Sequence, residues 1–164
     1  MRVFGFAGWS GSGKTTLIER LVPQLRSTGL AVSLVKHAHH DFDIDQAGKD
    51  SHRHREAGCQ EVLITSAMRW ALMRELRGAR ELTVDAAVAR LSPCDLVLIE
   101  GFKSAAIPKL EVYRASVGKP MLHPRDKNIL AVATDAPLAA PLPVFDLDDV
   151  SAIAAFILEH AQSR

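Results

Sequence analysis

The segment Gly8-Trp9-Ser10-Gly11-Ser12-Gly13-Lys14-Thr15 constrains the fold of this chain more than any other. It fits the pattern G-x-x-x-x-G-K-[ST], in which glycines let the backbone turn tightly and aim N–H groups at phosphate oxygens. A buried strand is predicted just before it, over residues 3–7, and apolar residues recur at helical spacing from Leu17 to Leu25. This order of strand, glycine loop and helix predicts a phosphate-binding P-loop.

Two side chains of the loop carry the expected chemistry. Lys14 can reach the β- and γ-phosphates of a nucleotide, and the Thr15 hydroxyl can ligate Mg²⁺. The helix that follows presents its positive dipole end to the same anion. The competing interpretation is a glycine-rich turn between a strand and a helix, but it does not explain why Lys-Thr follows the last glycine. We therefore expect a nucleotide to bind at this loop.

The composition limits the class of protein. A length of 164 residues is enough for one domain with a proper core, and we expect a single P-loop nucleotide-binding domain over residues 1–164. The chain is 48% hydrophobic and 24% charged, as ordinary globular proteins are. Its 20 Lys+Arg and 19 Asp+Glu give a net charge of +1, which offers no reason to expect binding to nucleic acid or membranes.

The cysteines and the apolar runs bear on localisation. Cys59 and Cys94 lack the spacing of a metal site and are expected to be small buried hydrophobes in a reducing compartment. The N-terminus runs directly into a strand and the P-loop, so no signal peptide is expected. No apolar run approaches the ~20 residues that a transmembrane helix needs. These features together predict a cytoplasmic protein.

Strands alternate with helices along the chain. The first helix is expected from about Gly13 to Ser27, with a kink or an early end at Pro23. Further helices are predicted over residues 50–57, 83–91 and 150–160, and strands over residues 31–35, 61–65, 70–73, 96–99, 109–113, 129–133 and 143–146. The second and third of these strands form a possible β-hairpin extension. The alternation predicts an α/β fold in which helices cover both faces of a mostly parallel sheet.

The strand predicted over residues 96–99 offers an acidic partner for the P-loop. Asp95 and Glu100 lie at its opposite ends, about 16 Å apart at ~3.3 Å per residue, so only one of them can approach the phosphates. Ligands of parallel α/β sheets bind beyond the carboxyl ends of the strands, which selects Glu100 rather than Asp95. The competing interpretation of Glu100 is a solvated strand end. Gly101 beside Glu100 permits the close approach of a ligand. Asp95 is better explained as a turn residue before the strand.

A segment rich in histidine and aspartate, over residues 36–45, follows the predicted second strand. The histidines between His37 and His40 could bind a transition metal, although no cysteine or regular ligand spacing accompanies them. Asp43 or Asp45 could contact Mg²⁺ and the γ-phosphate in a switch loop. The third alternative is a solvated polar loop. We favour a loop that contacts substrate or nucleotide.

Basic residues come next in the chain. Lys49, Arg53 and Arg55 suit phosphate contacts. Arg53 and Arg55 are two positions apart on a predicted helix, so they do not share a face and at most one of them points into a site. Asp50 or Ser51 is expected to cap this helix.

Several blocks of the sequence match one family together. They are Trp9 to Thr16, Lys36 to Asp41 with Asp43, Asp45 and Gly48 to Ser51, Arg69 to Met73, Asp95 to Lys103, and Ala131 to Asp135. In these blocks the chain resembles the molybdopterin-guanine dinucleotide biosynthesis protein B (MobB) family. The P-loop alone is generic, but the histidine-aspartate block and Ile99-Glu100-Gly101-Phe102-Lys103 are specific to that family. The blocks extend over most of the chain.

The resemblance implies a function that the residues alone do not show. Members of the family bind GTP and act in the last step of making the guanine dinucleotide form of the molybdenum cofactor, where a separate guanylyltransferase joins GMP to molybdopterin. The resemblance implies an accessory factor of this step, with at most weak GTPase activity and a homodimer built on the P-loop fold. It places the phosphates and Mg²⁺ on residues Gly11, Ser12, Gly13, Lys14, Thr15, Thr16 and Glu100. It also implies that Asp43 and Asp45 face the γ-phosphate or the pterin.

The sequence departs from related GTPases in two respects. It has no Asn-Lys-x-Asp motif for guanine, although Asp135 follows a predicted strand at a suitable place to accept hydrogen bonds from guanine N1 and N2. Trp9 occupies the position near the loop start where many dimeric relatives place a second, signature lysine. Since no arginine finger stands at a compelling spacing, fast hydrolysis is not expected.

Other functions and a dimer surface remain open from the sequence. A small-molecule kinase would use the same P-loop, but Lys103 to Arg114 is a poor arginine-bearing lid. An NTP-driven metal chaperone would use the histidine cluster. The run from Arg69 to Met73 is a candidate dimer edge, and a core role for Trp70 and Met73 is an equally good explanation.

Overall fold

The computed structural model describes residues 1–38 and 42–164 of the chain. The chain divides into two compact units, of which the first comprises Met1–His37 and Val84–Arg164 and the second is Ala38–Thr83. The second unit is therefore an insertion in the sequence of the first. The single domain expected over residues 1–164 stays a prediction. Within the described residues, no helix is long and apolar enough to cross a membrane.

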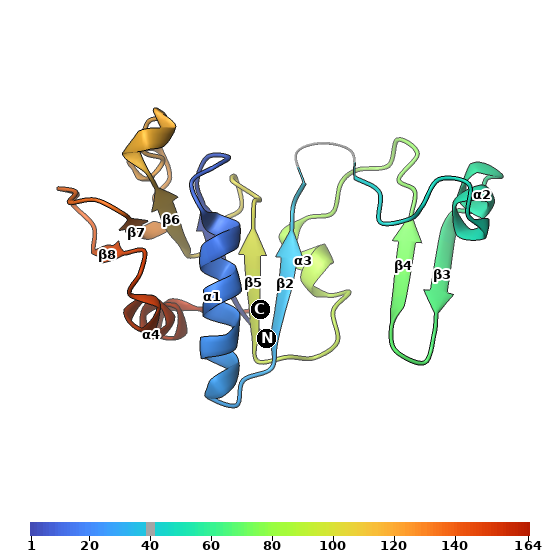
Figure 1. The fold of residues 1–164 in the computed structure, drawn as a ribbon, viewed down its shortest axis with the longest axis horizontal. Helices are drawn as coiled ribbons and strands as arrows, with labels where there is room; N and C mark the ends of the chain where they lie inside the picture. The colour runs from blue at the N-terminus through green and yellow to red at the C-terminus, as the bar shows by residue number, and fades with distance from the viewer. Residues whose placement is uncertain (39–41) are drawn as a thin grey trace. The chain divides into compact units, whose positions relative to one another are not determined.

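The described residues of the first unit form a seven-stranded sheet (Figure 1). Its strands are β1 (Arg2–Ala7), β2 (Val32–Lys36), β5 (Leu96–Glu100), β6 (Lys109–Tyr113), β7 (Ile129–Thr134), β8 (Val144–Asp146) and β9 (Gln162–Ser163). The parallel strands follow the order β2-β5-β1-β6-β7-β8, and the short β9 pairs antiparallel with the start of β1. The mostly parallel sheet predicted from the sequence is confirmed.

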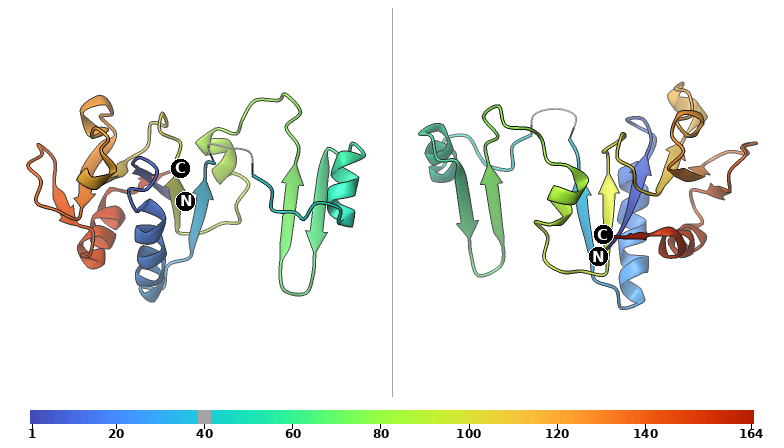
Figure 2. Two further views of the ribbon diagram at one scale, coloured as in Figure 1. Left: turned by 45° about the horizontal axis from the view of Figure 1, so that its top comes forward. Right: turned by 180° about the vertical axis from the view of Figure 1, so that it is seen from behind.

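Helices cover both faces of this sheet, as Figures 1 and 2 show. They are α1 (Lys14–Ser27), α3 (Val84–Val88) and α4 (Val150–His160), with two 3₁₀ helices, η1 (Ala115–Val117) and η2 (His123–Arg125), after β6. Phe4 and Phe6 of β1 belong to the core cluster formed with α1 and α4, whereas Val3 belongs to the cluster formed with α3. Successive side chains of a strand point to opposite faces, so β1 contributes to both cores.

Two helices differ at their ends from the sequence prediction. Helix α1 continues through Pro23 to Ser27, so the predicted early end is wrong. Pro23 lies on the exposed side of the helix, where water can satisfy the carbonyl that loses its N–H partner, while Leu21 and Leu25 are fully buried. Helix α3 ends at Val88 rather than at residue 91.

The second unit contains helix α2 (Asp50–Glu56) and an antiparallel pair of strands, β3 (Glu61–Thr65) and β4 (Trp70–Arg74). This pair confirms the predicted β-hairpin. Met73 of β4 is 9% exposed, whereas Trp70 is 65% exposed, so the core explanation holds for Met73 alone.

Two expectations for polar and small residues are wrong. The N-cap of α2 is Lys49, which makes no capping bond from its side chain. Asp50 therefore does not cap the helix, and the Ser51 hydroxyl instead donates a hydrogen bond to Asp45 Oδ1 at 2.7 Å. Cys59 is exposed rather than buried because it lies in the turn after α2, and Cys94 is half-buried.

Candidate functional site

The P-loop leaves the carboxyl end of β1 and enters α1 (Figure 1). Gly8, Gly11 and Gly13 have φ values of 148°, 81° and 97°, a range in which any side chain would be strained. A Cβ atom on Gly8 would lie 2.5 Å from the Val112 carbonyl oxygen, so only glycine fits there. The Ser12 hydroxyl is buried and has no hydrogen-bond partner within the described residues. An orphaned buried donor is costly unless a ligand satisfies it, which fits a loop that surrounds an anion.

The Lys14 ammonium lies inside the loop. It donates hydrogen bonds to the carbonyl oxygens of Gly8 and Trp9, each at 2.9 Å. Burial lowers the pKa of Lys14 below its usual value, and the positive charges of Lys103 and Lys36 lower this pKa further, against the opposing charge of Glu100. The side chain is thus a partly desolvated cation held in place before any phosphate arrives.

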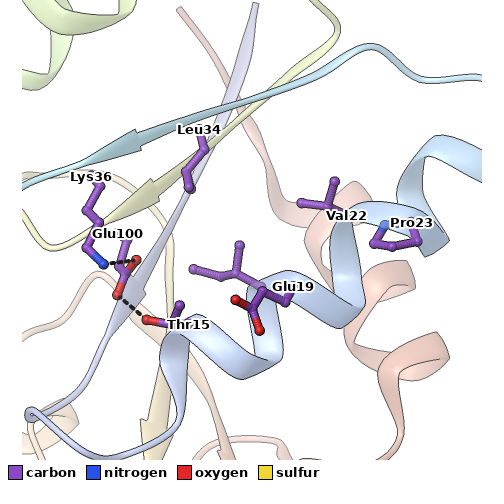
Figure 3. Close-up of a pocket in the computed structure, with 8 residues that line it drawn as sticks. Thr15, Glu19, Val22, Pro23, Leu34, Lys36 and Glu100 are labelled. Carbon is purple, nitrogen blue, oxygen red and sulfur yellow. Dashed lines mark hydrogen bonds and ion pairs between the residues drawn. The ribbon is translucent and has the colours of Figure 1, made fainter. Parts of the chain in front are cut away.

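Glu100, at the end of β5, meets the start of α1. Its Oε1 accepts a hydrogen bond from the Thr15 hydroxyl at 3.2 Å, and its Oε2 lies 3.5 Å from Lys36 Nζ (Figure 3). Glu100 is 7% exposed, so it is a buried carboxylate at the carboxyl edge of the sheet. A hydroxyl and a carboxylate oxygen at 3.2 Å are close to the ~2.9 Å that separates adjacent ligands of an octahedral Mg²⁺. The donors therefore fit Mg²⁺, which prefers hard oxygen ligands.

Gly101 lies in close contact with another part of the backbone. Its φ is +93°, and a Cβ atom there would lie 2.9 Å from the carbonyl oxygen of His37. The backbone just after β2 therefore approaches Gly101 closely, which only glycine allows. This contact, with the hydrogen bond from His37 N to Glu100 O at 2.8 Å, fixes the ends of β2 and β5 beside each other. The close approach of a ligand at Gly101 stays a prediction.

A groove of about 370 Å³ starts at Thr15 and Glu100 and runs along α1 (Figure 3). Four of its eight lining residues are apolar, and Lys36 and Glu100 lie at one end. The remaining residues that line it are Ile18, Glu19, Val22, Pro23 and Leu34.

Trp9, near the start of the P-loop, contacts residues of other loops. Its indole Nε1 donates a hydrogen bond to the Pro120 carbonyl oxygen at 2.7 Å. The ammonium groups of Lys103 and Lys119 lie 5.0 and 5.9 Å from the centre of the indole ring, within the range of cation–π attraction. Two lysines from other loops therefore lie over the ring at the position where the sequence lacks a second loop lysine.

Arg114, which follows β6, was not among the residues selected from the sequence. Its Nε donates to the Ser12 carbonyl oxygen at 3.1 Å, and its Nη1 donates to Asp135 Oδ2 at 3.0 Å. Asp135 follows β7, the neighbour of β6 in the sheet. The structure thus connects Asp135 to the P-loop through Arg114. The one signal in the sequence was that Arg114 directly follows a predicted strand, as Asp135 closely follows another.

Asp43 and Asp45 belong to the second unit, where both face Arg55. Arg55 Nη2 lies 2.7 Å from Asp43 Oδ2, and its Nε lies 3.5 Å from Asp45 Oδ2. The bond from Arg55 lowers the pKa of Asp43, and the bond from the Ser51 hydroxyl lowers the pKa of Asp45. Glu75 completes the cluster, 2.6 Å from Arg55 Nη1. A role for Asp43 and Asp45 toward γ-phosphate or pterin stays a prediction.

The metal interpretation rests on His37, His39 and His40, and the last two lie outside the described residues. The ring of His37 packs against Phe102, with the ring centres 4.7 Å apart. In residues 1–38 and 42–164, no group of three or more His, Cys, Asp or Glu side chains is placed to hold a metal ion.

Known proteins resemble this chain over nearly its whole length. The molybdopterin-guanine dinucleotide biosynthesis adapter protein of Escherichia coli (strain K12) is 40% identical over 165 residues, which cover 99% of this chain and 94% of that protein. The adapter protein of the same name from Haemophilus influenzae is 42% identical, over 94% of this chain and 86% of its own length.

Solved structures share the fold, and a family model matches the sequence. A crystal structure of molybdopterin-guanine biosynthesis protein B aligns with a TM-score of 0.74 at 32% identity, covering 96% of this chain and 98% of that one. The crystal structure of Bacillus subtilis MobB also aligns with a TM-score of 0.74, at 25% identity, and each chain is fully covered. The family model for molybdopterin guanine dinucleotide synthesis protein B matches residues 3–135. The chain therefore belongs to the MobB family.

Proposed function

We propose that this protein is a GTP-binding accessory factor in molybdopterin guanine dinucleotide synthesis, which supports a separate guanylyltransferase. The names of the relatives from E. coli and H. influenzae, molybdopterin-guanine dinucleotide biosynthesis adapter proteins, support this role. The observation that carries nucleotide binding is the meeting of Lys14, Thr15 and Glu100 at one edge of the sheet. With homodimers implied by the family resemblance, we also propose that two copies act together.

Different residues of the site bind different parts of the nucleotide. Backbone N–H groups from Gly11 to Thr16 and the Lys14 ammonium bind the phosphates, while Thr15 and Glu100 hold Mg²⁺. The bound ion would neutralise phosphate charge and orient the oxygens. Asp135 accepts hydrogen bonds from guanine N1 and N2. Hydrolysis is slow, on the order of minutes or slower per turnover, as for GTPases without a partner that supplies an arginine.

Nucleotide preference tests this proposal. Isothermal titration with GTP and ATP in the presence of Mg²⁺ is expected to show tighter binding of GTP. Equal affinity for the two nucleotides would contradict the assignment of GTP. Asp135→Asn sharpens the test, because an amide presents one donor and one acceptor and so matches the N1–H and C2 carbonyl of xanthine instead of the two donors of guanine. We expect D135N to bind xanthosine triphosphate more tightly than GTP, by about tenfold or more.

A second experiment measures whether the protein raises the activity of the guanylyltransferase. Adding the protein with GTP to a purified guanylyltransferase and molybdopterin should raise the yield of the dinucleotide, and Lys14→Ala should abolish this gain. The effect of K14A separates a nucleotide-dependent role from simple protein stabilisation. A phosphorylated product from molybdopterin or a nucleoside would point to a kinase instead.

A further inference from the structure

The Arg114 guanidinium joins two parts of the site that are far apart in the sequence. Its Nε donates a hydrogen bond to the Ser12 carbonyl oxygen at 3.1 Å, and its Nη1 donates one to Asp135 Oδ2 at 3.0 Å. The first contact fixes Arg114 to the loop that binds phosphate. The second fixes it to the carboxylate that the proposed function assigns to guanine.

Gly13 makes room for this contact. A Cβ atom on Gly13 would lie 3.3 Å from Arg114 Nε and 3.5 Å from Nη2, so the guanidinium lies against the bare backbone of the loop. Gly13 is also the N-cap of α1 and has a φ of 97°. The absence of a side chain at Gly13 therefore leaves room for the Arg114 guanidinium at the point where α1 begins.

An ion pair of this kind contributes little to folding. The side chains of Arg114 and Asp135 are 38% and 39% exposed, and pairs at such exposure add little to stability. The geometry suits positioning better, because a planar guanidinium that makes two directed bonds fixes the direction of each partner. A carboxylate has two oxygens with about four acceptor sites, so Asp135 can bind Arg114 and still accept from a base.

We propose that Arg114 is a positioning residue for guanine recognition, which sets the place of the Asp135 carboxylate relative to the P-loop. This inference rests on the proposed function. The phosphates are held by the loop and the base by Asp135, so the span between them must match the length of one nucleotide. Arg114 contacts both ends of that span.

Three probes separate positioning from a general effect on the loop. GTP engages the loop and Asp135, ATP lacks the two guanine donors, and inorganic tripolyphosphate reports on the loop alone. In Arg114→Ala we expect the affinity for GTP to fall about tenfold or more, while the affinities for ATP and tripolyphosphate change by less than about threefold. Arg114→Lys keeps the charge but lacks the fork, so it should recover only part of the loss.

Arg20→Ala is the matched control. Arg20 is 43% exposed and pairs with Asp148 at 2.7 Å, as Arg114 pairs with Asp135, but it belongs to neither the P-loop nor the base site. R20A should leave the affinities for all three probes unchanged. The double variant R114A/D135A should lose no more GTP affinity than D135A alone, since Arg114 acts through Asp135. Thermal melts of each variant check that it is folded, and Arg114→Gln replaces R114A if that variant is not.

The outcomes distinguish this inference from the proposed function. Wild-type protein that binds ATP as tightly as GTP would overturn both. A wild-type preference for GTP that R114A retains would overturn the role of Arg114 alone. An equal loss of GTP and tripolyphosphate affinity in R114A would also overturn it, because that result would show that Arg114 shapes the loop rather than the base site.

Discussion

Lys14 shows at the scale of one residue how the loop prepares for an anion. Its ammonium is shared between two backbone carbonyls at 2.9 Å and is partly buried. Burial, Lys103 and Lys36 together outweigh Glu100 and lower its pKa from 10.5. A polyanion binds the charged form of Lys14. Because its pKa is lowered, Lys14 loses its positive charge at a pH where ordinary lysines still carry theirs.

This shift predicts the pH dependence of phosphate binding. Because deprotonation removes the cation, affinity should fall as pH rises, and the fall should begin below the usual lysine pKa of about 10.5. Titration of the wild type and of K14A with inorganic tripolyphosphate from about pH 8 upward measures it, because ionisation of the probe affects both proteins alike. K14A should bind weakly and lack the fall in affinity that the wild type shows. Wild-type affinity that stays constant up to about pH 10.5 would contradict the prediction.

Glu100 provides a second prediction at this scale. Glu100→Gln keeps the size of the side chain but removes the charge beside Thr15, and we expect the apparent Mg²⁺ affinity in the presence of GTP to fall roughly 10–100-fold. Binding of GTP without Mg²⁺ should change much less. Glu19→Gln is the control, because Glu19 lines the same groove but has no hydrogen bond to Thr15. Unchanged Mg²⁺ dependence in E100Q would exclude Glu100 from the metal site.

At the scale of the element, strand β6 carries charged residues into the core. Lys109 is 1% exposed, and its Nζ donates to Asp126 Oδ2 at 2.6 Å and to the Lys103 carbonyl oxygen at 2.9 Å. Glu111 is equally buried and accepts hydrogen bonds from the backbone N–H groups of Leu122 and His123 at 2.6 and 2.9 Å. The strand thus anchors the loops that follow β5 and β6, which border the P-loop.

The ion pair between Lys109 and Asp126 predicts a stability effect. Asp126→Asn leaves a buried lysine without its counter-charge and should cost about 3–5 kcal/mol in the free energy of unfolding, measured with urea. The double variant K109M/D126N removes the buried charge and should recover most of this loss. A D126N variant as stable as the wild type would show that the pair contributes nothing. Equal losses in the single and double variants would show that the charge is not the cause.

The same pair predicts how the stability of the protein changes as the pH falls. Burial raises the pKa of Asp126, but the bonds from Lys109 and from Asn128 outweigh it, so the net pKa is lowered. A lowered carboxyl pKa contributes stability that is present above the usual value near 3.8 and is lost as pH falls through the lowered one. The K109M/D126N variant should therefore lose less stability than the wild type between about pH 5 and pH 2.

Elements with a regular apolar pattern could be predicted from the sequence, whereas contacts between elements could not. The spacing of Leu17, Leu21 and Leu25 indicates α1, and the apolar run before Glu100 indicates β5. Glu100 itself follows from the rule that ligands meet the carboxyl ends of parallel strands. The pairing of Arg114 with Asp135 depends on the adjacency of β6 and β7 and on the φ of Gly13, which no local pattern reports.

At the scale of the whole molecule, the proposed homodimer gives a further prediction. Trp70 of β4 is 65% exposed and lies opposite Thr65 on an isolated two-stranded pair whose outer edges are unpaired within the described residues. If copies associate through this edge, Trp70→Glu should weaken the dimer by about 2 kcal/mol, or roughly 30-fold in dissociation constant. Sedimentation equilibrium measures the change.

Leu82→Glu is the control for this prediction, because Leu82 is 37% exposed and lies outside the hairpin. Its dimer should sediment as the wild type does. A wild-type protein that sediments as a monomer would contradict the homodimer. A W70E protein that remains fully dimeric would instead exclude this edge as the contact.

The place of β1 in the sheet also determines when this strand can pair during translation. Its two parallel neighbours, β5 and β6, both follow the second unit in the chain, so β1 has neither parallel partner while residues 8–95 are made. At ~5–20 residues per second, a ribosome needs on the order of 5–20 seconds for this stretch. During that time the nascent chain carries an unpaired apolar strand, the kind of segment that chaperones shield. The phosphate loop is translated among the first residues, but the sheet beside it is complete only after β6 has been made.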